Sequence, residues 1–323
     1  MMKEKLYPLF FKPAIKNYIW GGQTFKQFLD HEPDYAEHIA EIWAIYEHNK
    51  VSNGSLAGKT LQEVVGLYKN NLLGTFYQSS NFENFPLLIK LLDCQEWLSI
   101  QVHPNDQQAL NLEGAGFNGK TECWYILDAD QNAQLIAGLK SDVDKEVLTR
   151  SIRNGTLTSQ LQYHNIRKDD YIFIPAGTIH ALGPGALVYE IQQNSDVTYR
   201  VFDWDRPASA GRLLHLEKSI AVANPEIRSI LHRAQNQSEQ NIFTCDYFSL
   251  DLYQSAGLHI ELNPGQESFH ALTVIEGSAT FDSESDHFIL HQYESVLVPA
   301  SYQAYRLHGD FKLLKGTLPE KKE

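Results

Sequence analysis

The clearest alternation of hydrophobic and polar side chains lies at residues 98–104, Leu-Ser-Ile-Gln-Val-His-Pro. Side chains two positions apart on a β-strand point to the same face, so Ser99, Gln101 and His103 share one face and the apolar residues between them share the other. Three successive polar groups backed by β-branched residues predict a strand that lines a polar cavity. In that cavity, Gln101 and His103 place two potential metal-ligand atoms side by side.

Other parts of the chain show the same period of two, or the short apolar runs typical of buried strands. These patterns predict strands at 41–46, 85–93, 120–127, 169–182 (two strands around a Pro-Ala-Gly turn) and 187–200. The last range is either one strand with a wholly polar face or a strand that bends at Asn194-Ser195-Asp196. Trp20-Gly21-Gly22 predicts a tight turn, because glycine adopts positive φ angles without strain.

Helix start signals mark several short helices. Thr60 and Glu63 have the spacing of a capping box ahead of an apolar stretch, which predicts a helix near 60–72. Further helices are predicted at 24–30, 105–113, 141–154 (with Ser141 at its start) and within 215–231, ending before Pro225.

The C-terminal part is predicted to be all β. Residues 233–241 (RAQNQSEQN) form the best candidate linker, and from 242 onward short strands alternate with turns. Residues 169–176 and 293–300 repeat one pattern, in which acidic residues precede an apolar strand that ends in Pro-Ala. Only the first copy continues to a histidine, His180, so we interpret the repeat as an internal duplication in which only the N-terminal copy kept a metal-type ligand.

Composition narrows the class of protein. The 323 residues are 43% hydrophobic and 21% charged, which is typical of a globular protein. A net charge of −13 disfavours nucleic acids and anionic membranes as partners, although a few local cations can still bind an anionic substrate. Three scattered cysteines, the lack of a signal-peptide pattern and the absence of an apolar run of about 18 residues predict a cytoplasmic protein.

Four residues on predicted strands are candidate metal ligands: Gln101, His103, Glu122 and His180. A single histidine on a strand is more often a hydrogen-bonded structural residue. The combination is stronger, because imidazole nitrogens and a carboxylate suit a borderline divalent ion such as zinc. A neutral amide ligand leaves the charge of the site positive, which favours an anionic or enediolate-like species.

The succession QVHP, KTE, PAGTIH and SDVTYR resembles the type I mannose-6-phosphate isomerases, in particular their short bacterial form, which are zinc-dependent members of the cupin superfamily. The resemblance covers nearly the whole chain. It implies a mainly β fold with two cupin-type jelly-roll barrels or sandwiches and a few short helices, the second barrel lacking metal ligands. The implied domains are a catalytic one at 1–232 and a degenerate cupin at 242–323.

The same resemblance implies that Gln101, His103, Glu122 and His180 bind one zinc ion per chain. It also places four residues in the substrate cleft: Ser99, Lys90, Lys120 and Arg200. The family interconverts mannose 6-phosphate and fructose 6-phosphate through an enediol. Longer relatives carry a large helical insertion, whereas the residues between Glu122 and His180 leave room for only a small one.

The chemistry assigns some roles and leaves others open. Arg200 keeps its proton and therefore suits charge stabilisation or phosphate binding better than base catalysis. Candidates for proton transfer are Glu190, Asp196, Lys120 and a zinc-bound water. Asp196 precedes Arg200 by four residues and is expected mainly to orient it. Lys90 interrupts an apolar run, so it either extends to the surface or contacts the phosphate.

Two other functions compete with a zinc isomerase. His103, Glu122 and His180 also form the two-His-one-carboxylate set of iron(II) oxygenases, although Gln101 would then fill a position that oxygen needs. The second competitor is a non-catalytic sugar-binding cupin. The expected partner is a small sugar phosphate, with no nucleic acid and no membrane, and the chain is expected to be a monomer or a weak homo-oligomer.

Overall fold

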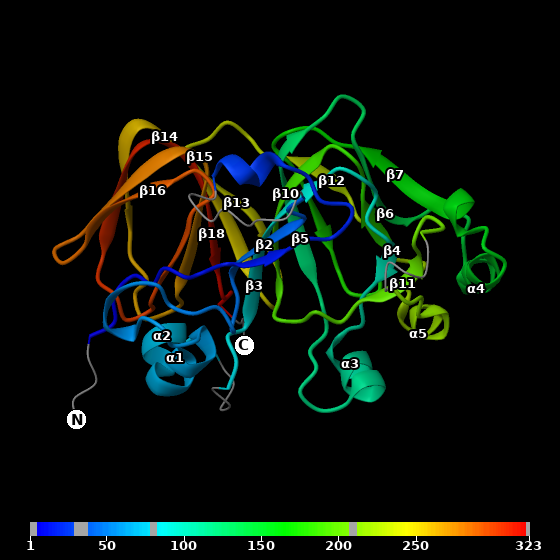
Figure 1. Cartoon of the computed structure of the whole chain (residues 1–323), viewed down its shortest axis with the longest axis horizontal. Coiled ribbons are helices and arrows are strands. Elements are labelled where there is room, and N and C mark those ends of the chain that lie inside the picture. Colours follow the sequence, from blue (N-terminus) through cyan, green and yellow to red (C-terminus); the bar gives the residue numbers. More distant parts are fainter. Residues whose placement is uncertain (1–4, 29–37, 78–82, 207–211, 321–323) are drawn as a thin grey trace. The chain divides into compact units, whose positions relative to one another are not determined.

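The computed structural model describes residues 5–28, 38–77, 83–206 and 212–320, and their fold is mainly antiparallel β-sheet, as predicted (Figure 1). Two compact units divide the chain. Unit 1 comprises Met1–Ile15, Ile42–Lys90 and Ala234–Glu323, and unit 2 comprises Lys16–Glu41 and Leu91–Arg233. The domain boundaries at 232 and 242 stay a prediction. Within the described residues, no helix is long and apolar enough to cross a membrane.

Unit 2 is built on two sheets. One has the strand order β1-β2-β3-β10-β5-β8-β12, and the other has the order β11-β4-β9-β6-β7. The first sheet consists of β1 (Ala14–Lys16), β2 (Glu41–Ile45), β3 (Leu87–Cys94), β5 (Glu122–Ala129), β8 (Asp170–Ile174), β10 (Ala186–Gln193) and β12 (Leu231–Arg233). The second consists of β4 (Ile100–Val102), β6 (Gln134–Leu139), β7 (Leu161–Asn165), β9 (His180–Leu182) and β11 (Tyr199–Phe202). The division between the units falls within β1, β2 and β3.

Short helices complete both units. Unit 2 has η1 (Thr24–Gln27), α3 (Asp106–Glu113), α4 (Lys145–Arg153), η3 (Leu157–Gln160) and α5 (Leu216–Val222), and unit 1 has η2 (Gly54–Leu56), α1 (Leu61–Tyr68) and α2 (Asn70–Leu73). The strands of the C-terminal sheet in unit 1 are β13 (Glu239–Thr244), β14 (Ser249–Leu262), β15 (His270–Asp282), β16 (His287–His291), β17 (Ser295–Val298) and β18 (Tyr305–Thr317).

The β11-β4-β9-β6-β7 sheet is covered on both faces. Leu135 and Leu182 share a core with Trp124 and Ile172 of the seven-stranded sheet, so the two sheets pack face to face. On the other face, residues of β4 and β11 share a second core with residues of α4 and α5. This arrangement explains the alternation in 98–104, because Ile100 and Val102 are buried under the helices while Gln101 and His103 face the space between the sheets.

The capping box predicted for Thr60 and Glu63 is present, and the predicted helix after Asn105 begins with a second one. Thr60 and Glu63 cap α1, and Asn105 and Gln108 cap α3, each through reciprocal side-chain and backbone hydrogen bonds. The helix expected from Ser141 instead begins at Lys145, because the side chain of Asp144 accepts the hydrogen bond from Val147 N–H. Of the helix expected at 24–30, the structure has η1, and residues 29 and 30 lie outside the described ranges.

The structure decides the alternatives left open for 187–200. The chain bends between β10 and β11, where Gln192 donates a hydrogen bond to the Ser195 carbonyl and Ser195 N–H donates to the Gln193 carbonyl. The candidate linker at 233–241 is partly strand, since β12 ends at Arg233 and β13 begins at Glu239.

The turn predicted at Trp20-Gly21-Gly22 is present, but the reason given for its glycines is wrong, and one of the two alternatives for Lys90 is excluded. Gly21 and Gly22 do not have positive φ angles; the turn closes with Gly21 N–H on the Tyr18 carbonyl. Glycine is needed instead for close approach, because a Cβ at Gly22 would lie 2.2 Å from the Asp93 carboxylate. Lys90 does not extend to the surface: it is 6% exposed and its Nζ lies 5.0 Å from the centre of the Trp43 ring.

The two copies of the repeated segment adopt the same conformation. Asp169 and Tyr293, at matching positions, have φ angles of 67° and 69°. In both copies the next residue, an acid, accepts a hydrogen bond from the backbone N–H three residues earlier. The strand registers match as well, with Glu122 opposite Ile174 in one copy and His270 opposite Val298 in the other. His270 therefore corresponds to Glu122, and there it hydrogen-bonds the Tyr305 hydroxyl at 2.7 Å.

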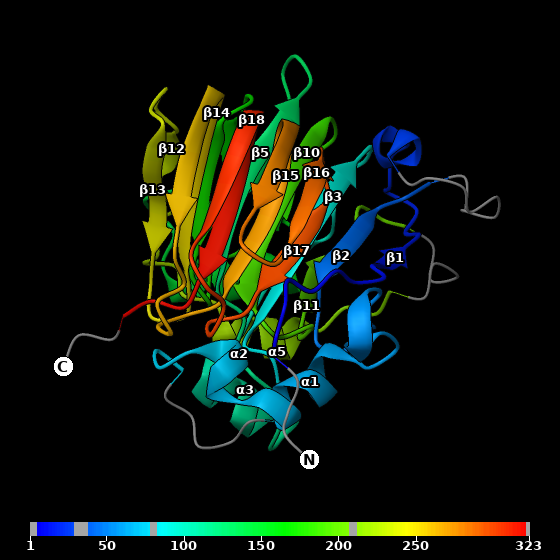
Figure 2. The ribbon, with the colours of Figure 1, turned by 90° about the vertical axis from the view of Figure 1, so that its left-hand side faces the viewer.

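Glycines bend the long strands of unit 1. Gly257 in β14, Gly277 in β15 and Gly309 in β18 have positive φ angles. The three strands are neighbours, with β18 between β14 and β15 (Figure 2). Each glycine lies at or next to a shift in strand register, so the regular pairing of the three strands is interrupted at these positions.

Gly277→Ala tests the close approach at one of these positions. A Cβ at Gly277 would lie 2.1 Å from the Asp310 carbonyl oxygen, whereas a Cβ at Gly257 would meet nothing within 4 Å. We expect Gly277→Ala to lower the free energy of unfolding by about 2 kcal/mol or more, and Gly257→Ala by about 1 kcal/mol from the positive φ alone. Urea denaturation measures both, and equal losses would contradict the steric argument.

Candidate metal centre

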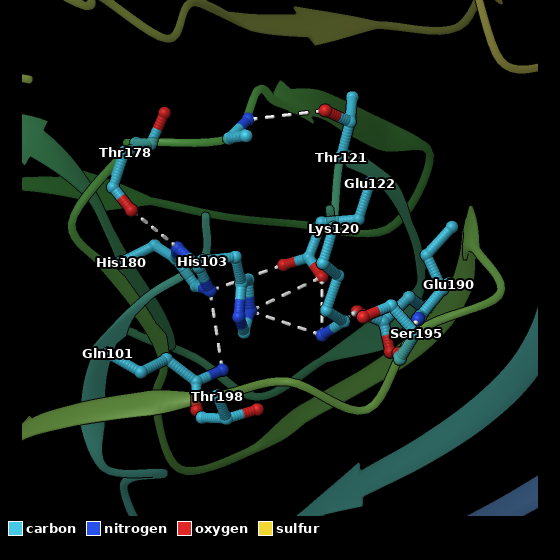
Figure 3. Close-up of polar contacts among 12 residues, drawn as sticks. Gln101, His103, Lys120, Thr121, Glu122, Thr178, His180, Glu190, Ser195 and Thr198 are labelled. Carbon is cyan, nitrogen blue, oxygen red and sulfur yellow. Dashed lines mark hydrogen bonds and ion pairs between the residues drawn. The ribbon is translucent and has the colours of Figure 1, made fainter. Parts of the chain in front are cut away.

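Three buried side chains converge between the two sheets of unit 2. His103 follows β4, Glu122 begins β5 and His180 begins β9. One ligand atom from each lies within 4.8 Å of the others, and all three residues are at most 1% exposed (Figure 3). Two imidazoles and one carboxylate at such distances form a candidate metal-binding group.

Backbone carbonyls orient both histidines. His103 Nδ1 lies 2.8 Å from the Val197 carbonyl oxygen, and His180 Nδ1 lies 2.9 Å from that of Thr178. A carbonyl oxygen only accepts hydrogen bonds, so each Nδ1 carries the proton and each Nε2 presents a lone pair toward Glu122. Burial, followed by the charge of Lys120, lowers the pKa of His180 to about 3, so the ring is neutral and ready to bind a metal at neutral pH.

Glu122 contributes the negative charge of the group. Its Oε1 lies 3.2 Å from His180 Nε2, and its Oε2 lies 3.7 Å from His103 Nε2. Oε2 also forms an ion pair with Lys120 Nζ at 2.7 Å, yet neither oxygen accepts a well-oriented hydrogen bond within the described structure. Burial raises the pKa of Glu122, although the Lys120 charge opposes the shift. A buried carboxylate without good hydrogen bonds fits a metal ligand.

Gln101 lies next to the group from the adjoining strand. It pairs directly with His180 across β4 and β9, and its amide nitrogen lies 3.3 Å from His180 Nε2. Half a turn of the amide exchanges its nitrogen and oxygen, which brings the oxygen, the atom that binds metals, to the same place. The structure therefore brings all four predicted ligands together.

A network of hydrogen bonds holds the segment that carries Lys120 and Glu122. Asp106 Oδ1, in the first turn of α3, accepts bonds from Gly119 N–H and from the Gln193 side chain. Gln193 in turn accepts from Thr121 N–H. These bonds tie the residues before β5 to α3 and to the end of β10, and they restrict where Lys120 and Glu122 can lie.

Glu190 and Lys120 lie beside the ligand group. Glu190 Oε1 accepts a hydrogen bond from Trp124 Nε1 at 3.1 Å and lies 3.7 Å from Lys120 Nζ. Lys120 Nζ is also 3.1 Å from His103 Nε2. The ammonium group of Lys120 thus lies between two buried carboxylates, next to the candidate metal ligands (Figure 3).

Arg200 faces the same space from β11. It lies directly opposite Gln101, so Arg200, Gln101 and His180 form one row across β11, β4 and β9. Side chains directly opposite each other on antiparallel strands share a face, and neighbouring strands lie about 4.8 Å apart. Arg200 Nε is buried and forms no hydrogen bond to the described residues.

Ser99 lies two residues before Gln101, about 7 Å along the strand direction. It is fully buried and accepts a hydrogen bond from Arg212 Nη2 at 3.0 Å, while Arg212 Nη1 lies 3.3 Å from Asp203 Oδ1. Sequence reasoning missed Arg212. The residue lies in a stretch without strand or helix periodicity, so only its tertiary contact with Ser99 identifies it.

Two predicted site residues have other contacts. Lys90, on β3, lies over the Trp43 ring. Asp196 is exposed, and among the described side chains it forms no ion pair with Arg200, contrary to the role expected from its position four residues earlier. Trp124 orients Glu190 through its indole N–H.

Comparisons with known proteins agree with the geometry. Residues 9–136 match the family "Phosphomannose isomerase type I, catalytic domain", and residues 238–317 match "Mannose-6-phosphate isomerase, cupin domain". The chain is 36% identical over 315 residues to the mannose-6-phosphate isomerase ManA of Bacillus subtilis, with 94% of this chain and 96% of the relative covered. The chain belongs to the type I mannose-6-phosphate isomerase family.

Other members of this family extend the likeness. The mannose-6-phosphate isomerase of Streptococcus mutans is 31% identical over 322 residues, which covers 95% of this chain and 97% of the relative. The crystal structure of the Bacillus subtilis mannose 6-phosphate isomerase superposes with a TM-score of 0.86 at 34% identity, covering 96% of this chain and 99% of that one. The cupin fold predicted for this chain is confirmed.

His180→Ala tests the candidate metal group. We expect the variant to lose its bound metal, because one of the three clustered ligand atoms is removed. Metal analysis of purified protein measures the stoichiometry, and a rise in melting temperature on adding zinc chloride reports binding to the folded state.

His232→Ala is the matched control for this experiment, because His232 lies on β12 and stacks on Tyr171. Glu122→Gln, which keeps the size of the side chain, covers the case in which His180→Ala does not fold. Full metal content in both His180→Ala and Glu122→Gln would remove these residues from the ligand set.

Proposed function

We propose that this protein interconverts mannose 6-phosphate and fructose 6-phosphate, with one zinc ion per chain held by four residues: Gln101, His103, Glu122 and His180. The observation that carries the proposal is the buried His-Glu-His group in a member of the mannose-6-phosphate isomerase family. A cytoplasmic location and a monomeric or weakly associated state are part of the same proposal.

The proposed ligand set fits zinc and the reaction. Two neutral imidazoles, one carboxylate and a neutral amide suit a borderline divalent ion and leave the site with a net positive charge. When bound, zinc supplies Lewis-acid polarisation of the sugar carbonyl and stabilises the negative charge that develops on the enediol oxygens. Gln101 supports this function over that of an iron oxygenase, because its amide lies beside His180 and completes a fourth position.

Cations next to the ligand row suit the phosphate end of the substrate. Arg200 and Arg212 converge on β4. Arg200 Nε is buried without a hydrogen bond to the described residues, whereas Arg212 is paired with Asp203 and Ser99. Planar guanidinium groups bind phosphate through paired hydrogen bonds. The distance of about 7 Å between positions 99 and 101 along the strand suits an open-chain sugar that presents its carbonyl end to Gln101 and its phosphate to Ser99, Arg200 and Arg212.

Proton transfer between C2 and C1 requires a group that can take and return a proton close to the sugar carbons. Lys120 and Glu190 are buried, lie 3.7 Å apart and adjoin the ligand group, so we assign the transfer to this pair. The exposed carboxylate of Asp196 is less suited to this role. Lys90 stays a candidate for substrate binding.

A coupled assay tests the proposed function. Mannose 6-phosphate is given to zinc-loaded protein and fructose 6-phosphate is measured as it forms. We expect turnover that chelation of the metal abolishes and added zinc restores. Folded, zinc-loaded protein that binds the sugar phosphate without turnover would support a non-catalytic cupin, and iron content with substrate-dependent oxygen uptake would support an oxygenase.

Arg200→Ala and Arg212→Ala test the proposed anion site. We expect Arg200→Ala to keep its zinc and to lose about 10²-fold in kcat/KM, as is typical when a preorganised charge stabiliser is removed. Arg212→Ala is expected mainly to raise KM, since it removes a phosphate contact away from the reacting carbons.

Arg153→Ala is the control for these two variants. Arg153 is exposed at the end of α4 and pairs with the exposed Glu217 of α5. Near-normal kinetics in both Arg200→Ala and Arg212→Ala would reject the anion site.

A further inference from the structure

Arg200 lies on an edge strand whose outward backbone groups have an unusual partner. β11 is the terminal strand of its sheet and is paired with β4 on one side. Edge strands usually leave their outward N–H and C=O groups to solvent. Here Arg200 N–H donates to His215 Nδ1 at 3.3 Å, and the Arg200 carbonyl accepts from His215 N–H at 2.8 Å. One residue therefore satisfies both outward backbone groups of Arg200.

This contact requires a neutral imidazole. Nδ1 accepts a hydrogen bond only when it carries no proton, which places the ring proton on Nε2. Burial is the largest cause that lowers the pKa of His215, and the charges of Arg200 and Lys218 act in the same direction, whereas Glu113 opposes them. Tyr199 is a further titratable neighbour, with its ring centre 6.1 Å away and its hydroxyl donating to Glu113.

His215 also lies on the segment that carries the second arginine. Arg212, three residues earlier, contacts Ser99 and Asp203. Burial is the largest cause that lowers the pKa of Arg212; Asp203 opposes the shift, and the charge of Arg200 adds to it, so the two cations lie close enough to repel each other. Without a tie between their segments, this repulsion favours their separation. The two hydrogen bonds between His215 and Arg200 provide such a tie.

We propose that His215 is a positioning residue that holds Arg200 and Arg212 together for the substrate phosphate, and that it does so only while its imidazole is neutral. The proposal rests on the proposed function, which assigns both arginines to the phosphate. It adds a residue that touches neither the metal ligands nor the sugar. The two arginines act as one phosphate site because His215, three residues after Arg212, is hydrogen-bonded to the backbone of Arg200.

Three variants test this role. His215→Ala removes the acceptor, whereas His215→Asn keeps an acceptor, because the Asn side-chain oxygen takes the place of Nδ1 and does not titrate. His232→Ala is the matched control on β12. We expect His215→Ala to raise KM for mannose 6-phosphate and the inhibition constant of inorganic phosphate by about 3- to 10-fold, the usual worth of one hydrogen bond. His215→Asn and His232→Ala should stay within about 2-fold, and kcat and zinc content should change little in all three.

The pH profile separates positioning from a merely structural contribution. The phosphate group of the substrate titrates in the same way with every variant. Its contribution to the pH dependence therefore cancels in the ratio of kcat/KM between wild type and His215→Asn. Because burial lowers the pKa of His215 from the ordinary value of about 6.5, the wild-type ring becomes protonated and loses its acceptor only at a pH below that value. We therefore expect the ratio to fall on the acid side and to be constant above neutral pH.

Several results would overturn the proposal. They are His215→Ala behaving like His232→Ala, His215→Asn being as impaired as His215→Ala, and a pH-independent ratio of wild type to His215→Asn. If His215→Ala does not fold, the comparison of wild type with His215→Asn still decides. Wild-type protein without turnover would reject the proposed function instead, and inorganic-phosphate binding to the same variants, measured by calorimetry, would then test His215 separately.

Discussion

A fully buried carboxylate, Glu122, imposes the main constraint on unit 2. Removing a charge from water is costly unless nearby groups compensate it. Lys120 supplies a cation at 2.7 Å, and His103 and His180 direct lone pairs toward the same point. These groups offset the cost of burying the Glu122 charge only if their positions are fixed. The hydrogen bonds that hold the segment before β5 against α3 and β10 fix the position of Lys120.

The alternation of apolar and polar residues along β4 could be recognised in the sequence because it depends only on neighbouring residues of one strand. One face must be apolar to pack under α4 and α5, and the other must be polar to supply Gln101 and His103. Capping boxes are local in the same way, so Thr60 with Glu63 and the helix after Asn105 were predicted correctly. Recognition of the ordered motifs added the family and the set of ligands that the fold brings together.

Features that depend on distant parts of the chain were not predictable from local patterns. Gly22 is required by the carboxylate of Asp93, which lies about 70 residues away. Arg212 is functionally interesting because it reaches Ser99, and nothing in its own neighbourhood marks it. Lys90 interrupts an apolar run and would usually extend to water, but the Trp43 ring covers it. Such contacts become visible only when the tertiary structure is known.

The carbonyl groups that orient His103 and His180 belong to the main chain, at Val197 and Thr178. A main-chain carbonyl is present whatever side chain the residue carries. Mutation at these two positions therefore leaves the chemical identity of the supporting groups unchanged, and what it alters is packing. The orientation of both histidines therefore depends on the backbone conformation at these two positions. Conserving that conformation matters more for the metal centre than conserving the two side chains.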